Sequence, residues 1–289
     1  MALGRPLRLC GGVLAGGLLL TGCSGAGGGG TAEPAGSEQQ VTASGDTRSS
    51  PAQSPTPGAS NSPSASASAS PSATGLDFTP DPARAPKTRA EGLRLARAIA
   101  AVPVDLGPGF VKRNPYESDP GFWPVLSANC VWQREPLPAT VLASLTRYSE
   151  VPAEDGKGPI RIAAVVTVHR TATAADWEMA ETLEEALRCP DQQLRQGERI
   201  TDLFSQSSAY GDLANINSED ALTESGKYYS DELGGPYYYY WIQNRLAQVT
   251  MAVVGRGAKG RTKEEVDAAI LQGTGRMLNL AESELEAPE

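Results

Sequence analysis

Histidine is almost absent from this chain of 289 residues, which contains His169 alone. One imidazole cannot supply the two or three histidine ligands of common catalytic zinc sites. The Gly-x-Ser-x-Gly motif of many serine hydrolases and a Gly-rich phosphate-binding loop are also missing. A lone histidine is more often a surface residue or a hydrogen-bonded core residue than a catalyst. The sequence therefore offers no catalytic constellation built on His169.

Clusters of positive charge are missing from the sequence as well. The formal net charge is -9, and the lysines and arginines form no basic run. Nucleic acid and anionic membrane surfaces are bound by clustered Lys and Arg, whose charge neutralises phosphates. We therefore expect no nucleic-acid partner, and no cofactor is indicated.

The apolar run near the N-terminus, residues 9–20, is too short to span a membrane. As a helix it would measure about 18 Å, against about 30 Å for the hydrocarbon core of a bilayer. Arg5 and Arg8 precede it, and the sequence Leu-Thr-Gly-Cys, ending at Cys23, closes it. This order is typical of a secretory signal, and its end resembles a lipobox. We expect residues 1–22 to be a lipoprotein signal peptide and Cys23 to carry a palmitate-containing lipid anchor. The alternatives are a signal without lipid and an uncleaved anchor.

Large apolar residues are scarce in residues 23–76, which consist mainly of Gly, Ser, Ala, Thr and Pro. Such a segment cannot bury enough apolar area to offset its conformational entropy, so we expect a disordered tether. A flexible coil of this length has a root-mean-square span of about 40 Å. It would hold a folded domain away from the outer face of the cell membrane. The abundance of Ala, Gly, Arg and Asp fits an actinobacterial source.

Residues 77–289 carry the patterns of a single α+β domain. Helices are predicted from Thr88 to just before Pro103, from Thr173 to Cys189, and from Thr262 onward; the first and last begin with capping boxes. The predicted strands are residues 129–133, 141–148, 160–168, 199–208 and two within 237–254. Loops are predicted for residues 104–124 and 211–226. Short connections between the strands favour a mainly antiparallel sheet with helices packed on it.

Two apolar faces are predicted to be buried in this domain. The first belongs to a strand and consists of Ile160, Ile162, Ala164, Val166 and Val168. The second belongs to the middle helix and consists of Trp177, Ala180, Leu183 and Leu187.

The cysteines leave one pair inside the domain. Cys10 lies in the signal peptide and Cys23 is the expected lipidation site, so Cys130 and Cys189 remain. In an exported chain two remaining cysteines usually form a disulfide, and closing a loop of about 60 residues would stabilise the fold by roughly 4 kcal/mol. The alternatives are two free thiols or part of a metal site.

Aromatic residues are concentrated in residues 228–241, which include six tyrosines and a tryptophan. If the second half of this segment is a strand, Tyr237, Tyr239 and Trp241 share one face while the tyrosines between them share the other. We predict that the first set, together with Tyr228, binds a ligand, because such side chains suit sugar, lipid or protein contacts. The alternative is that both sets fill the core.

Acidic residues offer two further candidate sites. Glu219, Asp220 and Glu224 could supply the paired carboxylates of a glycoside hydrolase, or they are solvated loop acids. Oxygen ligands for calcium occur in the same segment: Asp212, Asn215, Asn217, Glu219 and Asp220. Their spacing departs from that of an EF-hand, so no metal site is predicted.

The order of these features resembles a known type of domain. A lipobox and Ser/Pro tether precede an acidic domain in which Cys130 is followed by a helix ending at Cys189-Pro190, an aromatic segment and a terminal helix. This layout resembles the sensor domain of actinobacterial lipoproteins and of mycobacterial PknH kinases. The resemblance implies an α+β fold with a concave face that binds ligands rather than catalyses. The kinase domains carry two disulfides and this chain can form only one, so no individual binding residue is transferred.

The expected function is therefore that of a membrane-anchored extracytoplasmic lipoprotein with a non-enzymatic, sensor-like domain. Its partner would be a cell-envelope ligand or protein. The alternatives are a cell-envelope hydrolase that acts on glycans through carboxylates and a structural or chaperone role.

Overall fold

The computed structural model describes residues 76–207 and 217–287, all of which belong to one compact unit, Ala67–Glu289. The predicted signal peptide, Cys23 and nearly all of the predicted tether lie outside these residues. The elements follow one another in this order: α1 (Arg89–Ile99), the 3-10 helix η1 (Pro103–Leu106), β1 (Val111–Glu117), β2 (Phe122–Leu126), β3 (Trp132–Pro136), β4 (Val141–Val151), β5 (Ile160–His169), α2 (Ala172–Arg188), β6 (Gln192–Arg195), β7 (Glu198–Ser207), β8 (Asp220–Ser230), β9 (Gly234–Leu246), β10 (Val249–Arg256) and α3 (Lys263–Leu285).

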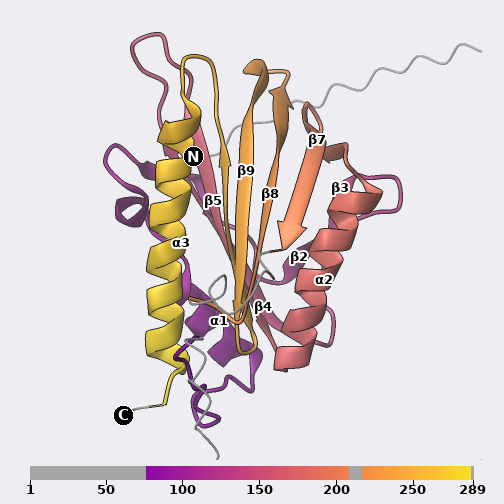
Figure 1. Cartoon of the computed structure of the whole chain (residues 1–289), viewed down its shortest axis with the longest axis vertical. Coiled ribbons are helices and arrows are strands. Elements are labelled where there is room, and N and C mark those ends of the chain that lie inside the picture. Colours follow the sequence, from indigo (N-terminus) through magenta and orange to yellow (C-terminus); the bar gives the residue numbers. More distant parts are fainter. Residues whose placement is uncertain (1–75, 208–216, 288–289) are drawn as a thin grey trace, which may run out of the picture. The chain divides into compact units, whose positions relative to one another are not determined.

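The strands form one large antiparallel sheet and one small one. Eight strands pair in the order β1-β4-β5-β10-β9-β8-β7-β6, and β2 pairs with β3 as a separate hairpin. The helices α2 and α3 lie on opposite sides of the large sheet (Figure 1). The predicted α+β class, with a mainly antiparallel sheet and helices packed on it, is confirmed.

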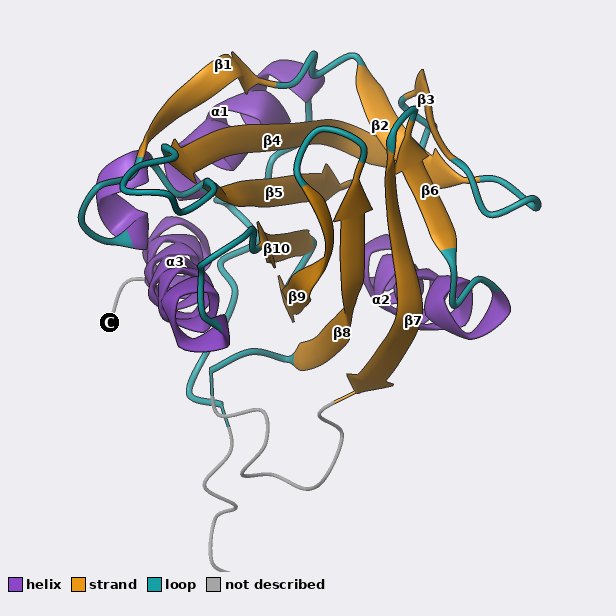
Figure 2. Ribbon diagram, turned by 90° about the horizontal axis from the view of Figure 1, so that it is seen from above, coloured by secondary structure: helices purple, strands orange, loops and turns teal. Residues whose placement is uncertain are grey.

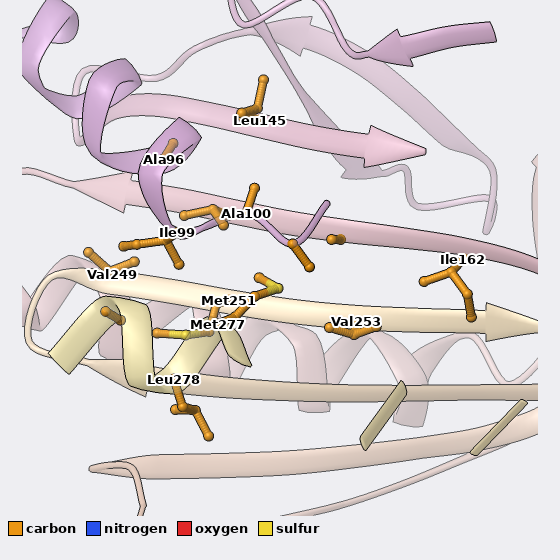
Figure 3. Close-up of a cluster of buried hydrophobic side chains, with 14 of the residues drawn as sticks. Ala96, Ile99, Ala100, Leu145, Ile162, Val249, Met251, Val253, Met277 and Leu278 are labelled. Carbon is orange, nitrogen blue, oxygen red and sulfur yellow. The ribbon is translucent and has the colours of Figure 1, made fainter. Parts of the chain in front are cut away.

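The outer face of the large sheet, the face that α1 and α3 cover, holds the main apolar core. All five residues of the predicted apolar face of β5 are buried there. Ile99 from α1 and Met277 from α3 point toward Val249 and Met251 of β10 (Figure 3). Full burial of one such side chain contributes about 1.5–3 kcal/mol, so this core supplies much of the stability of the domain.

The inner face of the sheet, the opposite one, is covered by α2 and by the β2–β3 hairpin. The sheet curls, as Figure 2 shows, and the hairpin contacts β4 through β2 and β6 through β3. Because β4 and β6 lie near opposite ends of the sheet, the hairpin spans its concave side. The inner face is therefore partly enclosed.

Side-chain caps define where the helices begin. Thr88 with Glu91, and Thr262 with Glu265, form the two predicted capping boxes. The middle helix starts earlier than predicted: the hydroxyl of Thr171, not Thr173, accepts a hydrogen bond of 3.1 Å from the backbone N–H of Ala174. Thr171 can serve because its extended backbone aims its hydroxyl at the free N–H groups of the first turn.

The predicted disulfide between Cys130 and Cys189 is confirmed, with the two Cα atoms 5.5 Å apart. The prediction that Cys130 lies on a strand is wrong, because it occupies a turn with φ at 61° just before β3. Cys189 caps the C-terminus of α2, and the carbonyl of Cys130 accepts a hydrogen bond of 2.9 Å from Gln193 N–H. The disulfide thus links the β2–β3 hairpin to the end of α2.

Two predicted loops are partly strands. Residues 104–124 contain η1, β1 and the start of β2, and residues 220–226 belong to β8, while residues 211–216 lie outside the described part of the chain. The sequence patterns of β1 and β8 are not typical of strands, for two physical reasons. Pro115 sits in the edge strand β1, where proline is tolerated, and β8 carries Glu224 and Gly226 on the inner face instead of alternating apolar residues.

The predicted buried stripe of the middle helix is also wrong. Trp177 is 64% exposed and Leu187 is 74% exposed, while Ala175, Met179 and Ala186 are buried instead. The helix is turned so that a more polar side meets the sheet. Sequence periodicity favoured the larger apolar residues, but the packing places small ones against the strands.

No helix in the described part of the chain combines the length and the apolar character needed to cross a bilayer.

Removal of the disulfide should destabilise the domain. The bond closes a loop with a sequence separation of 59 residues, for which the chain-entropy model gives about 4 kcal/mol. We expect the Cys130→Ser/Cys189→Ser double variant of the full chain to lose about 2–4 kcal/mol of unfolding free energy in urea titrations. The reduced wild-type chain should match this variant. Equal stability of oxidised and reduced wild type would contradict the prediction.

Candidate functional site

A hollow of about 70 Å³ lies between α2, the β2–β3 hairpin and the inner face of the sheet. We call it the aromatic hollow, because four large aromatic side chains line it: Trp123, Trp132, Tyr239 and Trp241. The other lining groups include four carboxyls and two amides: Glu178, Glu181, Glu185, Glu224, Gln192 and Gln243. This volume admits a few water molecules or one small group of a larger ligand.

The aromatic walls come from two elements that are far apart in the sequence. Tyr239 and Trp241 alternate along β9 and face inward, as the strand pattern predicted, whereas Trp123 and Trp132 come from the hairpin. The indole N–H of Trp132 donates to Gln192 Oε1 at 2.8 Å. The indole N–H of Trp241 donates in the same way to Gln243 Oε1 at 3.2 Å.

Both accepting amides hold their indoles in place. Gln192 and Gln243 are only 4% and 2% exposed, so their side chains have little freedom to move. A buried indole N–H without an acceptor would carry a desolvation cost, and these bonds remove it. The two tryptophans are therefore positioned before any ligand arrives.

The predicted binding residues divide between two environments. Tyr239 and Trp241 line the hollow. Tyr228 is fully buried in the inner-face core, and the hydroxyl of Tyr237 donates to the carbonyl of Leu233 at 2.6 Å, so neither lines the hollow. Of the tyrosines on the other face of β9, Tyr238 donates to Asp267 Oδ1 of α3 at 2.7 Å and belongs to the outer layer.

The carboxyl groups of the hollow come from α2 and β8. Glu178, Glu181 and Glu185 are spaced so that they share one side of α2, and Glu224 faces them from β8. Burial raises the pKa of Glu224 to about 8, and the negative charge of Glu185 adds to the rise. Burial likewise raises the pKa of Glu185 to about 7, although Arg188 opposes it. Near neutral pH Glu224 is therefore mostly protonated and Glu185 partly so, and a protonated carboxyl can donate a hydrogen bond.

The single histidine of the chain, His169, contacts one of these acids, Glu178. His169 is 2% exposed, and its Nε2 lies 2.5 Å from Glu178 Oε2. Thr250 donates its hydroxyl to the same oxygen at 2.7 Å. His169 does not line the hollow, so it orients Glu178 rather than contacting a ligand.

The acids predicted from the sequence do not meet in one site. Only Glu224 reaches the hollow, and it lies in a strand with 6% exposure rather than in a solvated loop. Glu219 pairs with Arg245 at 2.7 Å and accepts the backbone N–H of Ala247 at 2.6 Å.

The structure describes only some of the residues that were considered as calcium ligands. Asp212 and Asn215 lie outside the described residues. Within the described ranges no three His, Cys, Asp or Glu side chains gather as a metal site would require.

Sequence reasoning missed most of the lining residues. The one available signal was the spacing of Glu178, Glu181 and Glu185, which places three acids on one side of a predicted helix. Such a row usually faces solvent. The glutamines and the hairpin tryptophans carried no signal, because only the three-dimensional fold brings them to β9.

Replacement of Glu224 should change how stability depends on pH. The folded-state pKa of about 8 lies above the ordinary value of 4.5, so the unfolded chain releases this proton first as the pH rises. The contribution of Glu224 to folding stability is therefore fully present below pH 4.5 and is lost as the pH rises toward about 8. Relative to Glu224→Gln, wild type should lose at least about 1 kcal/mol of unfolding free energy between pH 5 and 9.

The control for this measurement is Glu284→Gln, which removes an exposed acid on α3. Its unfolding free energy should follow the wild-type pH profile. Parallel profiles for wild type and Glu224→Gln would contradict the raised pKa.

No protein-family model and no curated protein matches the chain.

Proposed function

We propose that this protein is a lipid-anchored extracytoplasmic protein whose domain binds a cell-envelope ligand in the aromatic hollow. The observation that carries the proposal is the convergence of three indoles and Tyr239 on one hollow, with the indoles of Trp132 and Trp241 fixed by buried amides. Preformed sites of this kind, with apolar walls and a few placed polar groups, are typical of ligand binding.

The lining favours a ligand with both flat apolar faces and hydroxyl or amide groups. Aromatic rings contact the C–H faces of such a ligand, and the amides and protonated carboxyls of Glu185 and Glu224 hydrogen-bond to its polar groups. Glycans of the cell envelope combine these properties. The small volume means that one small substituent of a sugar enters while the rest of the ligand lies outside.

The proposed location rests on the N-terminus and on the disulfide. Residues 1–23 resemble a lipoprotein signal, and Cys23 would anchor the protein to the outer face of the cell membrane. The Cys130–Cys189 bond supports an oxidising compartment, where disulfides persist. The likeness to sensor domains of lipoproteins and PknH kinases adds to this proposal and remains a resemblance.

Glycan hydrolysis is the second candidate function, and one observation favours it. Glu224 is protonated near neutral pH, as a general acid must be, and it shares the hollow with Glu178, an acid held by His169 and Thr250. Against it, the pKa of Glu185 is also raised, so the hollow is poor in free carboxylate.

Binding of glycan should depend on Trp241. We expect N-acetylglucosamine oligosaccharides to change the tryptophan fluorescence of the full chain, and Trp241→Ala to weaken binding at least about tenfold, the cost of losing one aromatic contact. Trp177→Ala is the matched control, because Trp177 lies on the solvent side of α2. If Trp241→Ala bound like wild type, the aromatic hollow would not be the binding site. Release of reducing sugar that Glu224→Gln abolishes would establish the hydrolase instead.

Substitution of Cys23 should release the protein from the membrane. We expect Cys23→Ala to take up no fatty-acid label in growing cells, because the thiol of Cys23 accepts the lipid. The unlipidated protein should then be lost from the membrane fraction. Cys10→Ala, a change within the signal peptide, should be labelled like wild type. A labelled Cys23→Ala protein would rule out the proposed anchor.

A further inference from the structure

A second hollow, of about 400 Å³, lies on the same inner face and is lined by five arginines. Each arginine comes from a different strand: Arg113 from β1, Arg134 from β3, Arg161 from β5, Arg195 from β6 and Arg256 from β10. We call it the arginine hollow. Its volume falls in the range of roughly 300–1,000 Å³ that small-molecule sites occupy.

The arginine hollow adjoins the aromatic hollow. Trp132 lines both, and the same inner face of β5 and β10 forms the floor of each. Strands β1 and β6, the two ends of the sheet, both contribute to the walls, because the sheet curls around this space. Apolar groups complete the lining, among them Leu194 and Val254.

Carboxylates only partly balance these charges. The buried Glu198 lies 3.0 Å from Arg256, is hydrogen-bonded to Arg195 and is 3.8 Å from Arg161. Glu150 lies 3.8 Å from Arg113. Glu232, the third acid nearby, is 3.3 Å from Arg161, but its side chain is 69% exposed.

Arg134 has no carboxylate partner among the residues that the structure describes. It lies 5.3 Å over the ring of Phe122 and donates to the carbonyl of Asp119 at 3.3 Å. Five guanidiniums therefore face three carboxylates. Positive charge is in excess here, within a chain whose formal net charge is -9.

The geometry of Arg161 leaves two of its buried donor groups without an acceptor among the described residues. Arg161 and Arg256 are direct cross-strand neighbours, a placement in which like charges repel. The Nε and Nη1 groups of Arg161 are buried and have no hydrogen-bond acceptor among the described residues. Glu150 lies 3.7 Å from Nε and Glu198 lies 3.8 Å from Nη1, which is too distant for hydrogen bonds, and Glu232 reaches only Nη2.

Crowding of the guanidiniums also affects Arg113 on β1, at the edge of the sheet. Burial lowers the pKa of Arg113, and the positive charges of Arg161 and Arg195 lower it further. Each effect would be relieved by a bound anion that accepts hydrogen bonds from several arginines at once.

We propose that the arginine hollow binds the phosphoryl group of a small ligand whose apolar part lies against Trp132 and Leu194. A guanidinium presents a planar fork of N–H donors that matches phosphate oxygens, and a phosphomonoester brings up to two charges and three acceptor oxygens. The inference extends the proposed binding function, on which it rests, from the aromatic hollow to its neighbour. A long polyanion is disfavoured because the rest of the chain is acidic and would repel it.

The test is titration calorimetry of the full chain, in detergent, with inorganic pyrophosphate. Wild type should bind, and Arg113→Gln and Arg134→Gln should each weaken binding at least tenfold. Arg134 pairs with no carboxylate among the described residues. The Arg134→Gln substitution therefore breaks no ion pair there, and the variant should fold normally. Arg94→Gln, which removes the same charge from the exposed side of α1, should bind like wild type. Absence of pyrophosphate binding, or equal binding by all four proteins, would overturn the proposal.

Two further arms define the ligand. Succinate at equal ionic strength should bind more weakly than pyrophosphate, and equal binding would overturn the preference for a phosphoryl group. Glycerol 3-phosphate and dioctanoyl phosphatidic acid share a phosphomonoester. Tighter binding of the lipid, lost in Arg134→Gln, would identify a lipid headgroup as the source, and equal binding would identify a soluble ligand.

The two proposed sites can fail separately. Trp241→Ala should weaken glycan binding at least about tenfold and leave pyrophosphate binding unchanged, since Trp241 does not line the arginine hollow. A chain that bound glycan but no pyrophosphate would retain the proposed function and refute the phosphoryl site.

Discussion

The packing of α1 and α3 on the outer face of the sheet is the interaction on which the rest of the domain depends. It buries a continuous set of aliphatic side chains from both helices and from the central strands β5 and β10. Because this layer supplies most of the apolar burial, the inner face is free to carry charged and polar side chains that would weaken a core. Both hollows lie on this more polar inner face.

The inner face is organised by enclosure rather than by close packing. Curling of the sheet brings its first and last strands to the walls of one hollow, and the hairpin closes over the gap. Such an enclosure lowers the local dielectric, so each charge acts more strongly than it would on an open surface. The raised pKa values of Glu185 and Glu224, the lowered pKa of Arg113 and the unmatched donors of Arg161 all follow from it.

The sequence predicted those parts of the molecule whose pattern is local. Short stretches of sequence are enough to predict the caps at Thr88 and Thr262, the alternation in β5 and the two faces of β9. The disulfide was predicted by elimination instead, because Cys130 and Cys189 are the cysteines that remain beyond the expected signal peptide and lipidation site. The site could be predicted only through Tyr239, Trp241 and the candidate carboxyl Glu224. Five arginines from five strands are separated by loops and helices along the chain, so their meeting is a property of strand order, which the pattern of one strand does not contain. The inward side of α2 was misjudged because large apolar residues outweighed small ones in the sequence pattern.

The bond between Cys130 and Cys189 joins the two walls of the aromatic hollow that do not belong to the large sheet. Trp132 follows Cys130 by two residues, and Glu185 precedes Cys189 by one helical turn. With the thiols reduced, the hairpin and α2 would be connected only by hydrogen bonds and side-chain packing. The disulfide therefore does more than stabilise the chain, because it also limits how far the indole of Trp132 can move from the carboxyl of Glu185.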